Sequence, residues 1–205
     1  MEAYEDQMRR GGDAAIAQAS RFFMKEDAVH QTLRKITRRL GELGIKYAVA
    51  GGMSLVAHGY GRTTVDVDVL VDDSGLQRIH QSLKGLGYVP PFAGSKSLRD
   101  VETGVRVEFL VTGQYPGDGK PKPVSFPDPA DAGVEIDGIR YLKLPVLIEL
   151  KLASGMTNPG RLRDLADVQE LIRVLNLPAD FAQSLNPFVR AKYAELWNGL
   201  RPAGE

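Results

Sequence analysis

The 205-residue sequence contains no cysteine, and this absence excludes several kinds of chemistry. The chain cannot form disulfides, use a thiolate nucleophile, or hold zinc or an iron–sulfur cluster through sulfur ligands. A reducing compartment is natural for such a sequence. Any reaction must therefore depend on carboxylates, hydroxyls, imidazoles and cations.

The sequence also lacks an excess of either charge and any long hydrophobic run. Lys plus Arg and Asp plus Glu both number 26, so no overall field draws the protein to nucleic acid or to a membrane surface. No window reaches the roughly 18 apolar residues of a membrane span, and the charged start lacks the apolar core of a signal peptide. We therefore expect a cytoplasmic protein with no membrane partner.

Acids and valines alternate in the segment TVDVDVLVDD, which we interpret as a strand. Successive side chains of a strand point to opposite faces, so Asp66 and Asp68 share one face and the valines share the other. Two carboxylates held this close repel each other and resist the loss of water. A divalent cation offsets both costs, and magnesium prefers such oxygen ligands while leaving positions for substrate phosphates.

A second predicted strand, VRVEFLV at residues 105–111, supplies a third acid. The same parity places Arg106, Glu108 and Leu110 on the face away from the valines. If the two strands are neighbours, three carboxylates converge, which is enough to bind one or two metals and to deprotonate a hydroxyl. The alternative is an amphipathic sheet edge whose acids only face water, and the alternation alone leaves this open.

A glycine pair precedes the acids. Gly51 and Gly52 end an apolar strand, fifteen and fourteen residues before Asp66, and Ser54 adds a hydroxyl nearby. Glycine lets a backbone approach a ligand closely and present N–H groups to phosphate. No Walker lysine follows the glycines and no GxGxxG opens a helix, so P-loop and Rossmann sites lack support.

The remaining pattern predicts an α/β fold with a small mixed β-sheet, helices against one face of it, and a helical C-terminal region. The composition, 43% hydrophobic and 25% charged, fits one globular domain with or without a helical appendage. We expect a helical extension over residues 1–26, a core over 27–143, and a helical region over 144–205 that closes the cleft. Within the core, Ser74 is expected to cap a helix, and Asp137-Gly138 to form a hairpin turn.

Two further groups of polar residues have open interpretations. Arg62 could bind phosphate or pair with Asp66 or Asp72. Lys151 interrupts the nearly apolar VLIELKLAS, where it must reach water or find an anion. In RLRDLADVQELI, an Arg163–Asp167 pair on an ordinary core helix is an alternative to a functional role.

The order of strand, Gly-Gly, short helix, Asp-x-Asp strand and a strand with a central Glu resembles the nucleotidyltransferase superfamily typified by polymerase beta and kanamycin nucleotidyltransferase. The resemblance covers roughly residues 45–111, with Gly-Gly where the family has Gly-Ser. It implies a nucleotidyltransferase-like fold in which Mg²⁺ or Mn²⁺ is held by Asp66, Asp68 and Glu108. It also implies a nucleotide-binding set of Gly51, Gly52, Ser54, Arg62 and Thr64.

Lys151 and the Arg-Asp-x-x-Asp segment are similar to signatures of AbiEii-like and MenT-like nucleotidyltransferases, several of which are toxins of toxin–antitoxin pairs. The resemblance implies that Lys151 contacts the triphosphate, that Asp164 assists catalysis and that Asp167 is accessory. It further implies transfer of a nucleoside monophosphate from a triphosphate to tRNA, a protein or a small molecule, with an antitoxin as partner if the chain is a toxin. The alternative is a catalytically silent module that binds a nucleotide or a partner.

Overall fold

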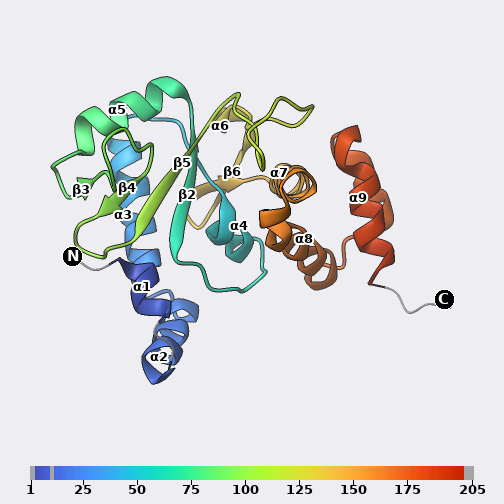
Figure 1. Cartoon of the computed structure of the whole chain (residues 1–205), viewed down its shortest axis with the longest axis horizontal. Coiled ribbons are helices and arrows are strands. Elements are labelled where there is room, and N and C mark those ends of the chain that lie inside the picture. The colour runs from blue at the N-terminus through green and yellow to red at the C-terminus, as the bar shows by residue number, and fades with distance from the viewer. Residues whose placement is uncertain (1–2, 10–11, 201–205) are drawn as a thin grey trace.

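The structure is a computed structural model, and it describes residues 3–9 and 12–200. In these residues one mixed sheet of seven strands runs through the molecule in the order β3-β4-β5-β2-β1-β7-β6 (Figure 1). The strands are β1 (Ala48–Val49), β2 (Asp66–Val71), β3 (Tyr88–Val89), β4 (Leu98–Asp100), β5 (Arg106–Val111), β6 (Gly133–Ile136) and β7 (Ile139–Leu142). β2 pairs in parallel with β5 and antiparallel with β1, which is the mixed pairing that the sequence predicts.

Helices surround this sheet and form most of the C-terminal third. The helices are α1 (Tyr4–Arg9), α2 (Gly12–Phe23), α3 (Ala28–Glu42), α4 (Gly51–Ala57), α5 (Asp73–Leu83), α6 (Pro129–Ala132), α7 (Leu144–Thr157), α8 (Leu162–Val174) and α9 (Pro187–Asn198), with 3-10 turns at Pro159–Arg161 and Ala179–Ser184. Among the helices in the described part of the chain, none combines the length and apolar character that crossing a bilayer requires.

Local sequence signals explain most element boundaries. Asp27 caps α3, its carboxylate accepting from the amide of Val29 at 2.6 Å. The expected Ser74 cap is wrong, because Asp72 takes that position and accepts from the Gly75 amide, while the Ser74 hydroxyl donates to Asp72. Asp137 and its following glycine both have positive φ, as the predicted two-residue hairpin turn between β6 and β7 requires.

The sheet is covered on both faces, so the expectation of helices against one face is incomplete. The valines of β2 face a core that includes α3 and α5. Leu70 lies on the acid-bearing face of β2, where it joins a second core with α7, α8 and α9. The apolar end of that face needs cover from water, and the buried apolar residues of α7, among them Leu147 and Ile148, supply it.

The N-terminal helices lie beside the ends at which β2 and β5 begin, and α2 projects away from the sheet (Figure 1). Tyr4 of α1 and Phe22 of α2 are buried in the first core. Glu5 accepts two hydrogen bonds from the Arg99 guanidinium, at 2.8 and 3.1 Å. These contacts dock α1 on β4, so the described part of the expected extension is attached to the core; residues 1, 2, 10, 11 and 201–205 of the expected regions lie outside the description.

Candidate functional site

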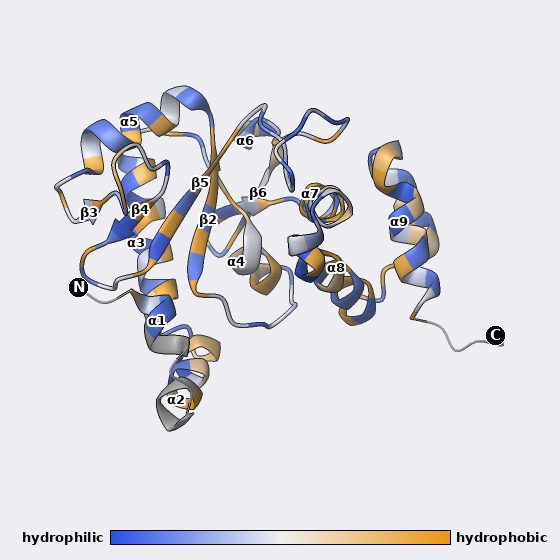
Figure 2. Ribbon diagram, in the orientation of Figure 1, coloured by the Kyte–Doolittle hydropathy of each residue, from blue (hydrophilic) through white to orange (hydrophobic). Residues whose placement is uncertain are grey.

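Three carboxylates meet on one face of the β2–β5 pair. The parallel register places Asp68 directly opposite Glu108 and Asp66 opposite Arg106. Carboxylate oxygens of Asp66, Asp68 and Glu108 all lie within 4.8 Å of one another. Bands of hydrophilic and hydrophobic residues alternate along β2 and β5 in Figure 2. The convergence of three acids, which depended on the two strands being neighbours, is therefore present.

The environment of Asp68 disfavours its negative charge. Burial is the main cause that raises its pKa to about 7, and the neighbouring charges of Asp66 and Glu108 raise it further. The positive charges of Lys151 and Arg161 act in the opposite direction and do not cancel the rise. A cation between the three carboxylates would remove the repulsion, and the all-oxygen donor set suits a hard divalent ion.

The glycine pair shapes the space beside Asp68. Gly51 has φ +55°, and a Cβ there would lie 1.7 Å from Oδ2 of Asp68. A Cβ on Gly52 would lie 2.6 Å from the Cβ of Thr64. The side chains of Asp68 in β2 and of Thr64 just before it thus lie directly against the α4 backbone, because the glycines there carry no side chain. The three carboxylates fit a metal site, and Gly51 lets the Asp68 carboxylate lie directly against the backbone at the start of α4.

Side-chain hydrogen bonds orient Asp66, the acid at the first position of β2. The Thr64 hydroxyl donates to Oδ1 of Asp66 at 3.0 Å. The Arg106 guanidinium donates to Oδ2 of Asp66 at 3.1 Å and lies 3.4 Å from Oε2 of Glu108. The parity of β5 places Arg106 on this face, but the sequence pattern assigned it no role. Its position directly opposite an acid in the paired strand was the missing signal.

Ser54 is buried, although the resemblance places it in the nucleotide-binding set. Its side chain is fully buried in α4, and its hydroxyl has no hydrogen-bond partner. It therefore adds no exposed hydroxyl to the surface around Asp68.

Lys151 finds its anion inside the protein. The residue is 7% exposed, and its ammonium donates to Asp164 at 2.9 Å and to Asp167 at 2.7 Å, which links α7 to α8. The Ser154 hydroxyl donates to the second oxygen of Asp164 at 2.7 Å. Burial would raise the pKa of Asp164, but Lys151 and Ser154 outweigh it and hold the pKa below its ordinary value. Lys151 is thus both a structural link and a positive charge that acts on Asp68.

Arg62 belongs to the same network. It pairs with Asp167, at 2.9 Å from Nε and 3.1 Å from Nη2, and so with neither Asp66 nor Asp72, the partners considered as one of two open alternatives. The alternative Arg163–Asp167 pair is not formed, because Asp167 turns inward to Lys151 while Arg163 is exposed.

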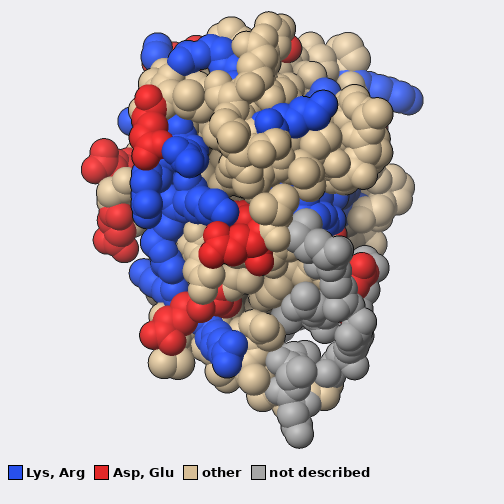
Figure 3. Space-filling model, turned by 90° about the vertical axis from the view of Figure 1, so that its left-hand side faces the viewer, with Lys and Arg blue, Asp and Glu red and all other residues tan. Residues whose placement is uncertain are grey.

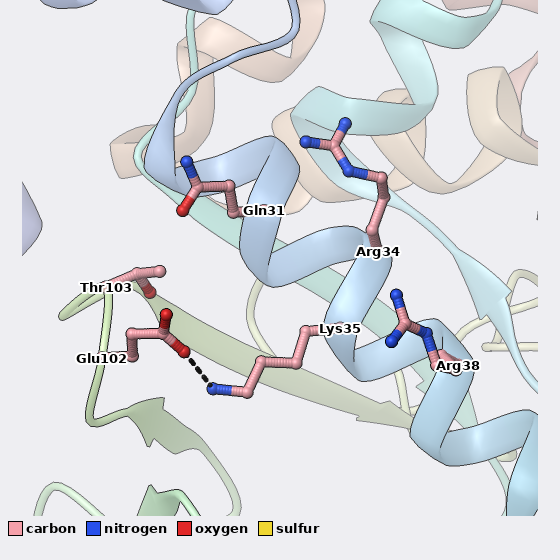
Figure 4. A pocket seen from close by; sticks show the side chains of 6 residues that line it. All are labelled: Gln31, Arg34, Lys35, Arg38, Glu102 and Thr103. Carbon is pink, nitrogen blue, oxygen red and sulfur yellow. Dashed lines mark hydrogen bonds and ion pairs between the residues drawn. The ribbon is translucent and has the colours of Figure 1, made fainter.

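A separate charged hollow lies on α3, on the other side of the sheet from the three acids (Figures 3 and 4). It has a volume of about 260 Å³, and its lining residues are Gln31, Arg34, Lys35, Arg38, Glu102 and Thr103. Basic side chains gather on this face, with acidic ones at the border. Lys35 is held by Glu102 at 3.1 Å and by buried Asp100 at 3.0 Å. The hollow contributes no group to the acid cluster.

Comparison with known proteins identifies the fold. No family model and no curated protein sequence matches the chain. Among solved structures, it is similar to an antigenic nucleotidyltransferase-like protein from Paracoccidioides brasiliensis, with a TM-score of 0.54 and 18% identity over 83% of this chain and 87% of that one. It is also similar to ANT(2")-Ia, solved in complex with adenylyl-2"-tobramycin, with a TM-score of 0.53 and 12% identity over 83% of this chain and 98% of that one. The seven-stranded mixed sheet and its helices therefore form a nucleotidyltransferase-like fold.

Proposed function

We propose that the protein is a metal-dependent nucleotidyltransferase that moves a nucleoside monophosphate from a triphosphate to an acceptor and releases pyrophosphate. The observation that carries the proposal is the convergence of Asp66, Asp68 and Glu108 within 4.8 Å on neighbouring parallel strands. The shared fold supports it, because two nucleotidyltransferase-like structures have the same architecture.

In this proposal the three acids hold Mg²⁺ or Mn²⁺, as their hard oxygen donors suit such ions. The bound ion would neutralise charge on the triphosphate and on the leaving pyrophosphate. Glu108, with 41% of its side chain exposed against 21% for Asp66, is the acid best placed to accept the proton of an acceptor hydroxyl. The acceptor oxygen then bonds to the α-phosphorus as the bond from that phosphorus to the pyrophosphate oxygen breaks.

The phosphate-binding part of the proposal rests on the backbone of Gly51 and Gly52 beside Asp68 and on exposed Arg161, whose charge reaches Asp68. Thr64 would act by holding Asp66 in position. Lys151 and Asp164 would set the position of α7 and α8 at the site, since a direct contact of Lys151 with phosphate requires it to leave one of its aspartates.

Pyrophosphate release from each of the four nucleoside triphosphates tests the enzyme class. Acceptor candidates are supplied as total tRNA, a protein extract and small hydroxyl compounds, each with Mg²⁺ or Mn²⁺. We expect Asp66→Asn to lower the rate by roughly 100-fold, a loss typical of removing one electrostatic group from an active site. Asp180→Asn, which changes an exposed acid in the 3-10 turn before α9, should match wild type. Equal rates for wild type and Asp66→Asn would end the proposal.

The second candidate is a catalytically silent module that binds a nucleotide or a partner. The buried hydroxyl of Ser54 and the internal pairing of Lys151 favour it, because two groups expected at the phosphates are not exposed to them. Nucleotide binding that depends on Asp68, without pyrophosphate release in any acceptor mixture, would select this candidate.

A toxin role with a cognate antitoxin is a narrower form of the first proposal. It is supported by the similarity of Lys151 and the segment that contains Asp164 and Asp167 to toxin-type nucleotidyltransferases. A cytoplasmic location fits this role, since triphosphates and tRNA are found there. Expression in a bacterial host should slow growth, and Asp68→Ala should restore it. Unimpaired growth at high expression of the wild-type protein would remove the toxin role and leave the enzyme class to the assay above.

A further inference from the structure

We propose that Arg106 is an internal counter-cation of the acid cluster. A divalent ion must displace the Arg106 guanidinium toward Glu5 of α1 before it can occupy the site. The inference rests on the proposed metal site. It adds a gate, which is the Arg106 guanidinium that must move before the metal ion binds. Arg106 is a positioning residue in this scheme, because its contacts are with the acids and not with a substrate.

The guanidinium lies where it satisfies the same electrostatic need as a metal ion. One nitrogen, Nη2, is 3.1 Å from Asp66 and 3.4 Å from Glu108, two of the three acids of the cluster. Hydrogen bonds from a guanidinium to carboxylates are charge-assisted and directional. The hydrogen bond to Asp66 and the ion pair with Glu108 place the positive charge of Arg106 on two carboxylates that a metal would also use. Binding of the ion and retention of both contacts therefore compete.

On the side away from Asp66, Arg106 lies beside Arg99 of β4 and near a further acid, Glu5 of α1. Arg106 lies opposite Asp66 of β2 and opposite Arg99 of β4, so the three side chains form a row on one face. Glu5 of α1 lies over this row, paired with Arg99 at 2.8 Å. Glu5 and Arg106 are close enough for the charge of each to stabilise the charge of the other.

The two positions of the Arg106 guanidinium differ in what they leave exposed. While the guanidinium keeps its contacts to Asp66 and Glu108, it reduces the repulsion within the cluster in the absence of metal. Turned toward Glu5, it leaves three carboxylates free and adds a second cation to the acid that docks α1. Loading of the site is thereby coupled to the attachment of α1, which lies more than fifty residues away in the sequence from both β2 and β5.

Binding of Mn²⁺ alone, measured by titration calorimetry on the full chain without nucleotide, tests the gate. We expect Arg106→Gln to bind Mn²⁺ about tenfold more tightly than wild type, because the competing cation is gone. Arg106→Lys, which keeps the charge but loses the planar fork, should lie between them. Glu5→Gln should weaken binding a few-fold in wild type and have no effect in the Arg106→Gln background.

Arg161→Gln is the matched control, because Arg161 also acts on Asp68 but has no contact with Asp66 or Glu108. The inference is overturned if Arg106→Gln binds Mn²⁺ no more tightly than Arg161→Gln does. Wild-type binding that Asp68→Asn abolishes, together with no gain in Arg106→Gln, removes the gate alone and leaves the proposed function intact. Absence of Mn²⁺ binding in every variant, each shown to be folded by circular dichroism, overturns the metal site and the gate together.

Discussion

Asp68 lies against the backbone of Gly51 on one side and two further carboxylates on the other. Each contact has a separate physical effect: the missing Cβ gives the carboxylate room, burial removes water, and the neighbouring acids oppose its charge. The periodicity of the strand predicts the shared face of the acids, because parity is a local property of the chain. The room beside Gly51 depends on two segments that meet only in the fold, so the pattern could not reveal it.

The raised pKa of Asp68 predicts a stability that depends on pH. Its pKa is about 7 in the folded protein and near the ordinary value of an aspartate when unfolded, so stability present at low pH is lost as pH rises between the two values. In the presence of a chelator, Asp68→Asn should therefore be more stable than wild type at pH 8, by about 1 to 3 kcal/mol. The difference should shrink toward pH 4.

Urea unfolding at several pH values measures this difference, and Asp180→Asn serves as the control for loss of an exposed acid. Parallel stability curves for wild type and Asp68→Asn from pH 4 to pH 8 would show that burial of Asp68 has no energetic consequence.

At the scale of elements, α7 and α8 are joined by the ion network of Lys151, Asp164 and Asp167. The sequence predicts a helical region over residues 144–205, and it singles out Lys151 as a charge that needs an anion. The sequence alone could not identify the anion that pairs with Lys151, because phosphate and carboxylate satisfy an ammonium equally well. The same limit applies to Arg62, whose partner lies more than a hundred residues away in the sequence.

Removing the charge of Lys151 should destabilise this helix pair. Lys151→Met removes the buried cation that Asp164 and Asp167 share, which typically costs about 3 kcal/mol, although Asp167 keeps its pair with Arg62 and Asp164 its hydrogen bond from Ser154. Arg163→Met changes a cation on the exposed side of α8 and should alter the free energy of unfolding by less than about 0.5 kcal/mol. Chemical denaturation of both variants gives the comparison, and similar losses in the two would mean that the Lys151 network contributes little to stability.

At the scale of the whole molecule, strand order decides whether the acids meet. β2 and β5 are adjacent in the sheet although α5, β3 and β4 lie between them in the chain. No local pattern predicts that adjacency, and the resemblance to nucleotidyltransferases supplied it. The cover of the acid-bearing face by α7 depends in turn on the pairing of β7 with β1.

Metal binding should stabilise the entire fold, since only the folded chain brings the three acids together. At 100 times the dissociation constant, Mg²⁺ or Mn²⁺ adds about 2.7 kcal/mol, which corresponds to a rise in Tm of roughly 5 to 10 °C. Thermal unfolding followed by circular dichroism, with and without the ion, measures the shift. Asp66→Asn and Asp68→Asn should lose most of it, whereas an equal shift in these variants would place the bound ion elsewhere.

The parallel pair of β1 and β7 joins Val49 to Tyr141, and this long separation has a consequence during synthesis. The ribosome makes β2, β5 and all three acids before it makes β7 or any residue of α7. Until those residues emerge, Leu70 and the apolar surface around it have no cover, while the acids already lie in the nascent chain. The nascent polypeptide therefore passes through a stage in which the charges of the acids are unshielded and the apolar surface around Leu70 is exposed to water. Chaperone binding would protect the chain most at this stage.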